Sequence, residues 1–359
     1  MLRARNFDSR SVERVGRVRP FGLGEPLKSS SLRREKSFAW LNLHQGIQKK
    51  DEDQQPQTSI YLNQSGSSKQ DFVVSGETLD FKWLVVADGH GKSIVINCFR
   101  AIDWAYVVNL PSTGQQMADY ICAEVDKLGN TSQSGATLTI VKIFPTHAEF
   151  YWAGDSTAKV YKNGQQIFQT KNHDLQNKDE VARVSAMGIK HKPCGFLTIK
   201  DENTLVNLKD ANAYFQFPSN FNFQNFMDEM NMTHAFGHNA ASGKFLSKSI
   251  FEFTETAHWK IVVGSDGLWD MTCDSDIPFI SNPNTTATNL GELAIKRWFK
   301  VWDKLLDKDG KVLLELGLNG WKGLIGNGDD VSVAVWSEFI EVKQLPTSSS
   351  PLRISSCPF

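Results

Sequence analysis

Short runs of apolar residues, alternating with polar ones or standing together, recur along the 359-residue chain. Runs of this length and period predict β-strands rather than helices. We expect strands at 82–87, 136–144, 148–154, 157–170, 259–267 and 329–340. The pair Asn163-Gly164 divides the run 157–170 and is a strong hairpin signal. Strands joined by such tight turns pair antiparallel.

Apolar residues spaced three or four apart predict helices at 94–108, 117–128 and 289–305. Trp104, Trp298 and Trp302 fall at core positions of this spacing. The helices come in separate blocks between runs of strands. This order favours an α+β fold in which helices cover antiparallel sheets.

Three stretches depart from these patterns. Residues 1–38 are rich in Arg, Ser and Gly without apolar periodicity, which predicts a disordered basic arm. An organellar transit peptide is the alternative, although four acidic residues in this arm oppose it. We place one domain at 39–342, with an irregular, Asn- and Phe-rich flap or insertion at 190–255, and a flexible tail at 343–359.

The overall charge does not point to a polyanionic partner. The formal net charge is −1, although residues 1–38 carry a local excess of six positive charges. Because the net charge is near zero, we do not expect nucleic-acid binding. Because no apolar run is long enough to span a bilayer, we do not expect membrane binding either. Five widely spaced cysteines form no CxxC pair. They indicate reduced thiols and a cytoplasmic location, and the basic arm leaves a nuclear or organellar one open.

Four predicted strands begin or end at an aspartate with a glycine within two residues. The segments are VVADGHG, YWAGDST, IVVGSDGLWD and GNGDDVSV. Taken singly, each is ordinary turn chemistry. If the strand ends meet in space, they gather one carboxylate cluster from Asp88, Asp155, Asp266, Asp270 and Asp329.

Such a cluster needs a cation. Two carboxylates about 4 Å apart repel by roughly 4 kcal/mol at an effective dielectric constant near 20. A set of oxygen ligands without thiolates suits Mg²⁺ or Mn²⁺. Several carboxylates around such ions indicate a two-metal site that activates a water and polarises a phosphoryl oxygen.

The joint occurrence of these segments resembles the metal-dependent Ser/Thr protein phosphatases of type 2C, the PPM family. The resemblance covers roughly residues 40–340 and includes SGATL at 134–138, which is similar to a structural strand of the family. It implies an α+β fold, a four-layer α-β-β-α sandwich with two central antiparallel β-sheets. It also implies two or three Mg²⁺ or Mn²⁺ ions.

The resemblance assigns roles residue by residue. Asp88 would bridge two ions and the Gly89 carbonyl would bind one of them. Asp266 and Asp329 would complete the main pair, and Asp155 and Asp270 would lie near a third, weaker ion.

The opening signature of the family is similar to QKKDED at 48–53, which makes Asp53 a metal ligand and Glu52 a ligand of metal-bound water. Gln48 stands where the family has a phosphate-binding Arg, and Lys49 lies beside it. A lysine binds phosphate as a point charge but lacks the two-pronged grip of arginine.

The chain departs from the family at three further positions. Asp330 replaces an Asn, and in NMTHAFGH at 231–238 His234 and His238 replace the Arg and Asp of the family segment. These changes bear on flap geometry and substrate choice more than on the metal core.

The resemblance implies a protein-serine/threonine phosphatase in which metal-bridged hydroxide attacks phosphoserine or phosphothreonine. His90 would protonate the departing oxygen, with Asp88 beside it; the alternative is a histidine that only packs or caps the next helix. A catalytically impaired scaffold or phosphoprotein-binding module is the second reading, because the phosphate-binding Arg is missing. In either case we expect a phosphoprotein partner and a monomer.

Overall fold

The computed structural model describes residues 57–64, 69–111, 113–216, 229–240, 242–318 and 328–342. All of them lie within the unit Asp53–Phe359. The predicted arm 1–38 and tail 343–359 lie outside the described residues, as do Gln48, Lys49, Glu52 and Asp53. The domain boundaries therefore stay predictions.

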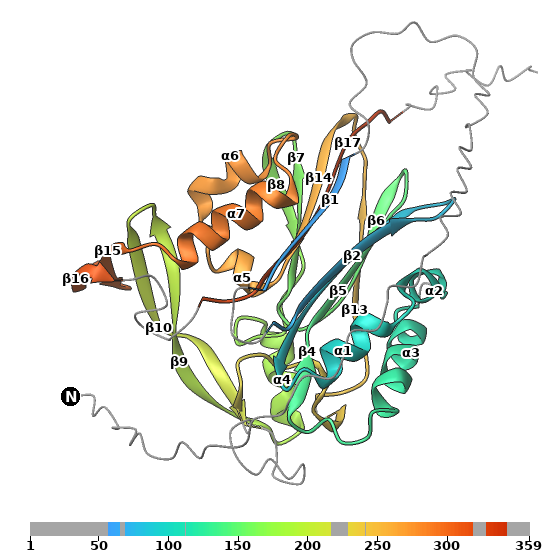
Figure 1. Cartoon of the computed structure of the whole chain (residues 1–359), viewed down its shortest axis with the longest axis horizontal. Helices are drawn as coiled ribbons and strands as arrows, with labels where there is room; N and C mark the ends of the chain where they lie inside the picture. The colour runs from blue at the N-terminus through green and yellow to red at the C-terminus, as the bar shows by residue number, and fades with distance from the viewer. Residues whose placement is uncertain are drawn as a thin grey trace, which may run out of the picture. The chain divides into compact units, whose positions relative to one another are not determined.

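Two antiparallel sheets form the centre of the described structure (Figure 1). The first has the strand order β1 (Gln57–Asn63), β17 (Val331–Ile340), β14 (Ala257–Gly264), β7 (Thr157–Lys162) and β8 (Gln165–Gln169). The second has the order β12 (Phe236–Gly237), β4 (Ser134–Ala136), β3 (Lys82–Gly91), β5 (Leu138–Ile143), β6 (His147–Ala153) and β13 (Ser247–Glu252), and β2 (Asp71–Glu77) also pairs with β3.

Alternating side chains of these strands divide between two cores. Leu84 and Val86 of β3 pack in the core between the sheets, together with Ile261 and Val263 of β14. Val85 of the same strand faces the helices on the outside of its sheet. The strand period of two thus lets one buried strand supply both faces of the sheet.

Helices cover the two outer faces (Figure 1). The second sheet packs on α1 (Ile94–Ala101), α2 (Trp104–Asn109) and α3 (Gln115–Asp126). The first packs on α5 (Asp266–Trp269), the short α6 (Ile277–Ile280) and α7 (Ala287–Trp298). The four-layer α-β-β-α sandwich is confirmed. A further helix, α4 (Lys178–Ala186), precedes the insertion.

Several predicted elements have different bounds. The predicted helix 94–108 is two helices, because Asp103 caps a new one by accepting the Tyr106 amide at 3.1 Å. The predicted helix 289–305 ends at Trp298. Trp302 is buried as expected, but in strand β15 (Trp302–Asp307). The hairpin at Asn163-Gly164 is confirmed, with positive φ of 46° and 90° at its two turn residues.

The described parts of 190–255, namely 190–216, 229–240 and 242–255, are not irregular. They contain the long strands β9 (Lys190–Asp201) and β10 (Thr204–Gln216), the short β11 (Glu229–Met230), and β12 and β13 of the second sheet. β10 pairs in parallel with β15, and β15 pairs with β16 (Val312–Leu318), so these strands form a third sheet. The sequence did not indicate this sheet, because its pairing joins residues about a hundred positions apart.

Candidate active site

Four strand ends bring their aspartates together between the two central sheets. Asp88 lies near the end of β3, Asp155 between β6 and β7, Asp266 at the start of α5 after β14, and Asp329 just before β17. Asp88 and Asp266 share a side-chain hydrogen bond, and both interact electrostatically with Asp329. Asp270, one helical turn after Asp266, interacts with Asp155, Asp266 and Asp329. The structure therefore gathers the five aspartates that the sequence grouped.

A sixth carboxylate, which sequence analysis missed, completes the cluster. Asp71 begins β2 and lies opposite Asp88 in the antiparallel pairing of β2 with β3. Its side chain is only 1% exposed and accepts a hydrogen bond from the Ser265 hydroxyl at 2.8 Å. The signal was present in the sequence as KQDFVVSGE, an acidic residue that opens a strand just before the one containing DGHG.

Burial and mutual repulsion disfavour the ionised forms of these carboxylates. Burial, followed by the charge of Asp329, raises the pKa of Asp71 to about 7. Burial also raises the pKa of Asp155 to about 6, of Asp266 to about 7 and of Asp329 to about 8, with neighbouring carboxylates adding to each shift. The pKa values of Asp88 and Asp270 are raised well above the ordinary range for the same reasons.

Backbone contacts allow these chain segments to approach closely. Gly89 donates its amide to the Gln70 carbonyl at 3.0 Å, and a Cβ at Gly89 would lie 2.9 Å from that oxygen. A Cβ at Gly267 would lie only 1.9 Å from the Asp330 carbonyl oxygen. The glycines beside Asp88 and Asp266 are therefore required by contacts with neighbouring backbone.

Asp330 links two of the converging strands. Its Oδ2 accepts the backbone amide of Gln70 at 2.7 Å, and the side chain is 1% exposed. This bond ties the start of β17 to the start of β2. Asp329 and Asp71, the neighbours of these two residues, are thereby held in the same cluster.

The oxygen ligands of this cluster are of the chemical type that divalent hard cations prefer. Oδ1 of Asp155 and Oδ1 of Asp266 are buried and have no hydrogen-bond partner among the described residues. Partnerless buried oxygens beside other carboxylates are an unfavourable arrangement that a cation would relieve. Among the described side chains alone, however, no group of three or more His, Cys, Asp or Glu is arranged so that it could hold a metal ion.

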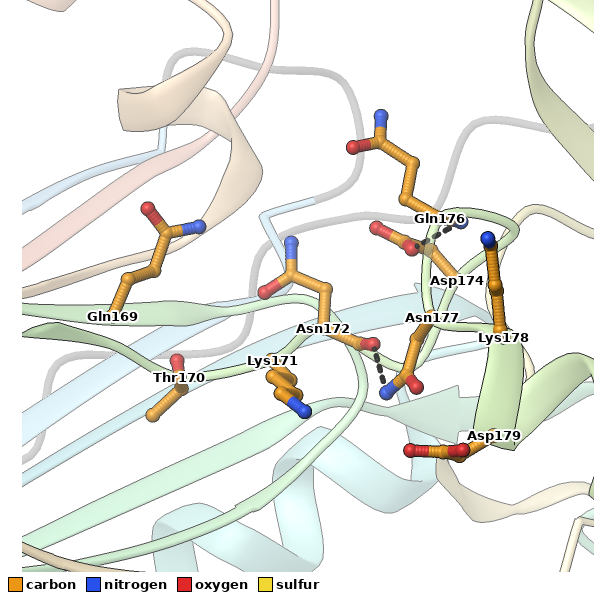
Figure 2. A pocket seen from close by; sticks show the side chains of 9 residues that line it. All are labelled: Gln169, Thr170, Lys171, Asn172, Asp174, Gln176, Asn177, Lys178 and Asp179. Atoms are coloured by element: carbon orange, nitrogen blue, oxygen red, sulfur yellow. Dashed lines mark hydrogen bonds between the residues drawn. The ribbon is translucent and has the colours of Figure 1, made fainter.

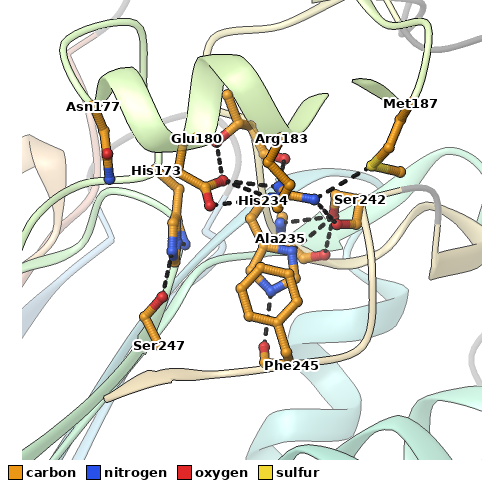
Figure 3. A network of polar contacts seen from close by, with 12 residues as sticks. His173, Asn177, Glu180, Arg183, Met187, His234, Ala235, Ser242, Phe245 and Ser247 are labelled. Carbon is orange, nitrogen blue, oxygen red and sulfur yellow. Dashed lines mark hydrogen bonds and ion pairs between the residues drawn. The ribbon is translucent and has the colours of Figure 1, made fainter. Parts of the chain in front are cut away.

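The polypeptide beside Asp155 is fixed by His173. Its Nδ1 accepts the Gly154 amide at 2.9 Å, and its Nε2 donates to the Ser247 hydroxyl at 2.8 Å (Figure 3). Burial lowers the pKa of His173 to about 3, which agrees with this neutral, fully bonded ring. His173 therefore holds the turn before Asp155 against β13.

A cavity of about 600 Å³ opens next to this turn (Figure 2). Among the described residues, its lining consists of polar side chains of the segment 169–179, among them Asn172, Asp174 and Lys178. Asn172 accepts the Thr157 hydroxyl at 2.8 Å, and the charge of Asp174 contributes to the raised pKa of Asp155. The cavity thus adjoins the Asp155 side of the cluster.

Comparison with known proteins identifies this arrangement. Residues 49–200 match the family model described as protein phosphatase 2C. This part of the chain is thus similar to the protein phosphatase 2C family. Protein phosphatase 1B of Rattus norvegicus is 32% identical over 133 residues, which cover 30% of this chain and 34% of the rat protein. The chain thus spans about a third of that relative.

Solved structures of the protein phosphatase 2C fold are similar in architecture. The serine-threonine phosphatase 2C from Toxoplasma gondii has a TM-score of 0.50 at 11% identity and covers 79% of this chain and 94% of its own. The serine/threonine phosphatase of S. agalactiae has a TM-score of 0.47 at 15% identity, with 80% of this chain and all of that chain covered. At these identities the likeness concerns the fold alone.

The two histidines that depart from the protein phosphatase 2C pattern have different environments. His234 donates from Nε2 to the Phe245 carbonyl at 2.8 Å, stacks on the Phe245 ring at 4.0 Å between centroids, and lies 3.0 Å from the Ser242 hydroxyl through Nδ1 (Figure 3). Both of its nitrogens are used within the protein, so His234 anchors the chain. His238 instead contacts His90, with 2.7 Å between the two Nε2 atoms.

His90 follows Asp88 by two residues and is partly exposed. Burial, with a smaller contribution from His238, lowers the pKa of His90 to about 3. Its Nδ1 is buried and has no hydrogen-bond partner among the described residues.

The phosphate-binding candidates Gln48 and Lys49 and the ligand candidates Glu52 and Asp53 lie outside the described residues and remain predictions. No helix in the described part of the chain is both long and apolar enough to cross a membrane.

Proposed function

We propose that this protein hydrolyses phosphoserine and phosphothreonine in other proteins and requires Mg²⁺ or Mn²⁺. The observation that supports this most directly is the single carboxylate cluster formed by four strand ends, with partnerless oxygens on Asp155 and Asp266. The protein phosphatase 2C family match over residues 49–200 supports the same activity.

Asp88, the Gly89 carbonyl, Asp266 and Asp329 would hold the main ions, with Asp53 contributed from outside the described residues. Asp71 contacts Asp88 and accepts a hydrogen bond from Ser265; it would either orient these metal ligands or act as a further ligand. Asp155 and Asp270 would hold a third, weaker ion. When bound, such ions would polarise the phosphoryl group and activate the attacking water.

The protein's own groups have separate tasks in this proposal. The aspartates would hold the ions at rigid strand ends and so orient the substrate phosphate. His90 gives a proton to the departing seryl or threonyl oxygen, an oxygen that leaves poorly without one. Gln48 and Lys49 bind the phosphate. We further propose a monomer acting in the cytosol.

A second function, phosphoprotein binding without turnover, is favoured by one observation. His234 stands where the family has an Arg, yet both of its nitrogens are occupied by Ser242 and Phe245. His234 therefore cannot replace that Arg as a cation, and this departure from the family pattern favours a protein without turnover. A scaffold would keep the carboxylate cluster and bind ions, but would release no phosphate.

The test is phosphate release from a phosphothreonine peptide with Mn²⁺, compared with chelator and with Asp266→Asn. Asp80→Asn is the matched control, because Asp80 is exposed in the turn at the far end of β2 and β3. We expect Mn²⁺-dependent turnover that Asp266→Asn abolishes and Asp80→Asn leaves unchanged. Calorimetric Mn²⁺ binding without turnover would instead establish the scaffold.

A further inference from the structure

The polar cavity beside the Asp155 turn lies outside the set of clustered aspartates. Its volume of about 600 Å³ is within the roughly 300–1,000 Å³ that is typical of ligand sites, and the described residues that line it belong to the segment 169–179 (Figure 2). Asn172 of this lining accepts a hydrogen bond from Thr157, which follows Asp155 by two residues. A group bound in the cavity would therefore lie only a few residues along an extended peptide from a phosphate at the cluster.

The backbone of this segment is fixed to its surroundings. The amide of His173 donates to the Gly154 carbonyl at 3.0 Å, and the His173 carbonyl accepts the Thr233 amide at 2.7 Å. The Lys171 carbonyl accepts the indole N–H of Trp152 at 2.7 Å. The cavity is therefore preformed, and a ligand does not have to order its wall.

The part of the wall formed by α4 is held by side chains of that helix. Arg183 donates to the Ser242 carbonyl at 2.9 Å and to the Thr233 carbonyl at 3.0 Å, and Glu180 accepts the Thr233 hydroxyl at 2.8 Å (Figure 3). These bonds join α4 to the loop that follows β11. Lys178, the first residue of α4, is thereby kept in the lining of the cavity.

The two acidic residues of the lining have roles within the protein. Oδ1 of Asp174 accepts the Gln176 amide at 2.8 Å, and the Asp174 side chain is partly buried. Asp179 lies in the first turn of α4, where a negative charge interacts favourably with the helix dipole. In the described structure no ion pair joins either carboxylate to Lys171 or Lys178.

The two lysines of the lining have no such role. Lys171 and Lys178 are exposed, and in the part of the chain that the structure describes their ammonium groups form no hydrogen bond or ion pair. Gln169 uses its Oε1 to accept from Gln166 at 3.3 Å, which leaves its NH₂ group as a donor. A carboxylate, which only accepts hydrogen bonds, is complementary to these donors.

We propose that this cavity binds the carboxylate side chain of an Asp or Glu that lies close to the phosphorylated residue of the substrate protein. Lys171 and Lys178 determine this specificity. The inference rests on the proposed phosphatase function and narrows its substrates to phosphoproteins with an acidic residue near the phosphoserine or phosphothreonine. Exposed charge pairs are individually weak, so the two lysines give a preference and not an absolute requirement.

The kinetic test compares phosphothreonine peptides that differ only by a Glu or a Gln, placed in turn at each flanking position. At the preferred position we expect kcat/KM of the Glu peptide to exceed that of the Gln peptide about three- to tenfold. In Lys171→Met/Lys178→Met this ratio should fall to about 1, with little change for the Gln peptide. Lys308→Met is the matched control, because Lys308 is exposed in the turn between β15 and β16, and it should keep the ratio of the unaltered protein.

Reversing the charge of the two lysines sharpens the test. Lys171→Glu/Lys178→Glu should favour a peptide with Lys over one with Glu at the same position. A ratio near 1 at every position in the unaltered protein would refute the proposal, and so would a ratio that the Met substitutions leave unchanged. A preference of the unaltered protein for Lys would also refute it and would assign the cavity to the carboxylates of Asp174 and Asp179.

Peptide binding separates this inference from the proposed function. Fluorescence anisotropy of labelled Glu and Gln phosphopeptides with Asp266→Asn measures Kd without turnover, and the Glu peptide should bind about three- to tenfold more tightly. Equal Kd values at every position would overturn the proposal. If the unaltered protein hydrolyses no peptide, the phosphatase function fails, and the ratio of Kd values still decides whether the cavity binds an acidic side chain.

Discussion

Asp71 and Asp88 lie directly opposite each other on adjacent antiparallel strands, one at the start of β2 and the other near the end of β3. Asp71 is buried and Asp88 is partly exposed, so the pair forms an inner and an outer position of the same cluster. The hydroxyl of Ser265, next to Asp266, joins Asp71 to the third strand end.

Asp71→Asn should weaken Mn²⁺ binding about 10- to 100-fold, the loss typical for a residue that orients metal ligands. Calorimetric titration measures it. Ser265→Ala is the graded control, because it leaves the Asp71 carboxylate in place and removes only the hydroxyl, which donates to Asp71 and accepts the Ser332 amide; it should give a smaller loss. Wild-type affinity in Asp71→Asn would show that Asp71 only packs beneath the site.

In the metal-free protein, the folding stability should depend on pH because the carboxyl groups of the cluster have raised pKa values. A carboxyl group whose pKa is raised in the folded state keeps its proton while the unfolded chain has lost it, so folding stability falls as pH rises through the folded pKa. For Asp266 that pKa is about 7. Its destabilising effect is absent below about pH 4 and is complete above about pH 8.

Asp266→Asn removes this effect together with the share of Asp266 in the raised pKa values of Asp88, Asp270 and Asp329, and both changes favour the variant as pH rises. Buried histidines such as His173 and the buried Lys260, whose pKa is lowered to about 7, act with the opposite sign. In chelator, the melting temperature of Asp266→Asn minus that of the unaltered protein should increase from pH 5 to pH 8. A constant difference would contradict the raised pKa of Asp266.

Asp330→Asn should stabilise the metal-free protein by about 1 kcal/mol. The amide oxygen can still accept the Gln70 amide, while one negative charge that raises the pKa of Asp329 disappears. Asp330→Ala leaves the buried Gln70 amide without this acceptor and should cost about 1–3 kcal/mol. Urea denaturation of the two variants measures both changes, and a loss of stability in Asp330→Asn would refute the argument.

Arg297→Met should be among the most destabilising changes outside the site. The guanidinium of this α7 residue is 2% exposed and binds both carboxylate oxygens of Asp276, at 2.6 and 2.9 Å, as well as Glu202. Removing it leaves Asp276 buried and unpaired, which typically costs about 3–5 kcal/mol.

Denaturation of Arg297→Met in an Asp276→Asn background provides the check for that pair. The cost of losing Arg297 should be lower there by about 1–3 kcal/mol, because no charge is left unpaired. Equal costs in the two backgrounds would mean that the ion pair contributes little.

Local sequence patterns predicted most strands and the α+β class, because the strands have period-two faces and the acidic turns have glycines, and the family resemblance implied the four-layer sandwich. Asp88, Asp155, Asp266, Asp270 and Asp329 could be grouped from those turns alone. Asp71 could not, since its place depends on the register of β2 against β3. The contact of His90 with His238 depends in the same way on a left-handed turn of non-glycine residues, which composition does not reveal.

The helical spacing of 289–305 was overridden for a similar reason. Residues 302–305 belong to the predicted helix, but a parallel partner strand was available in β10. Pairing with residues about a hundred positions away outweighed the local preference.

That pairing makes β9–β10 and β15–β16 a joint appendage. Strand β10 of the first hairpin pairs with strand β15 of the second, so each hairpin covers an edge strand of the other. In addition, Arg297 of α7, the helix that precedes β15, forms an ion pair with Glu202 in the turn between β9 and β10. Deleting either hairpin alone would leave an edge strand of the other hairpin unpaired and exposed, which promotes aggregation. Shortened relatives of this chain should therefore lack both hairpins together.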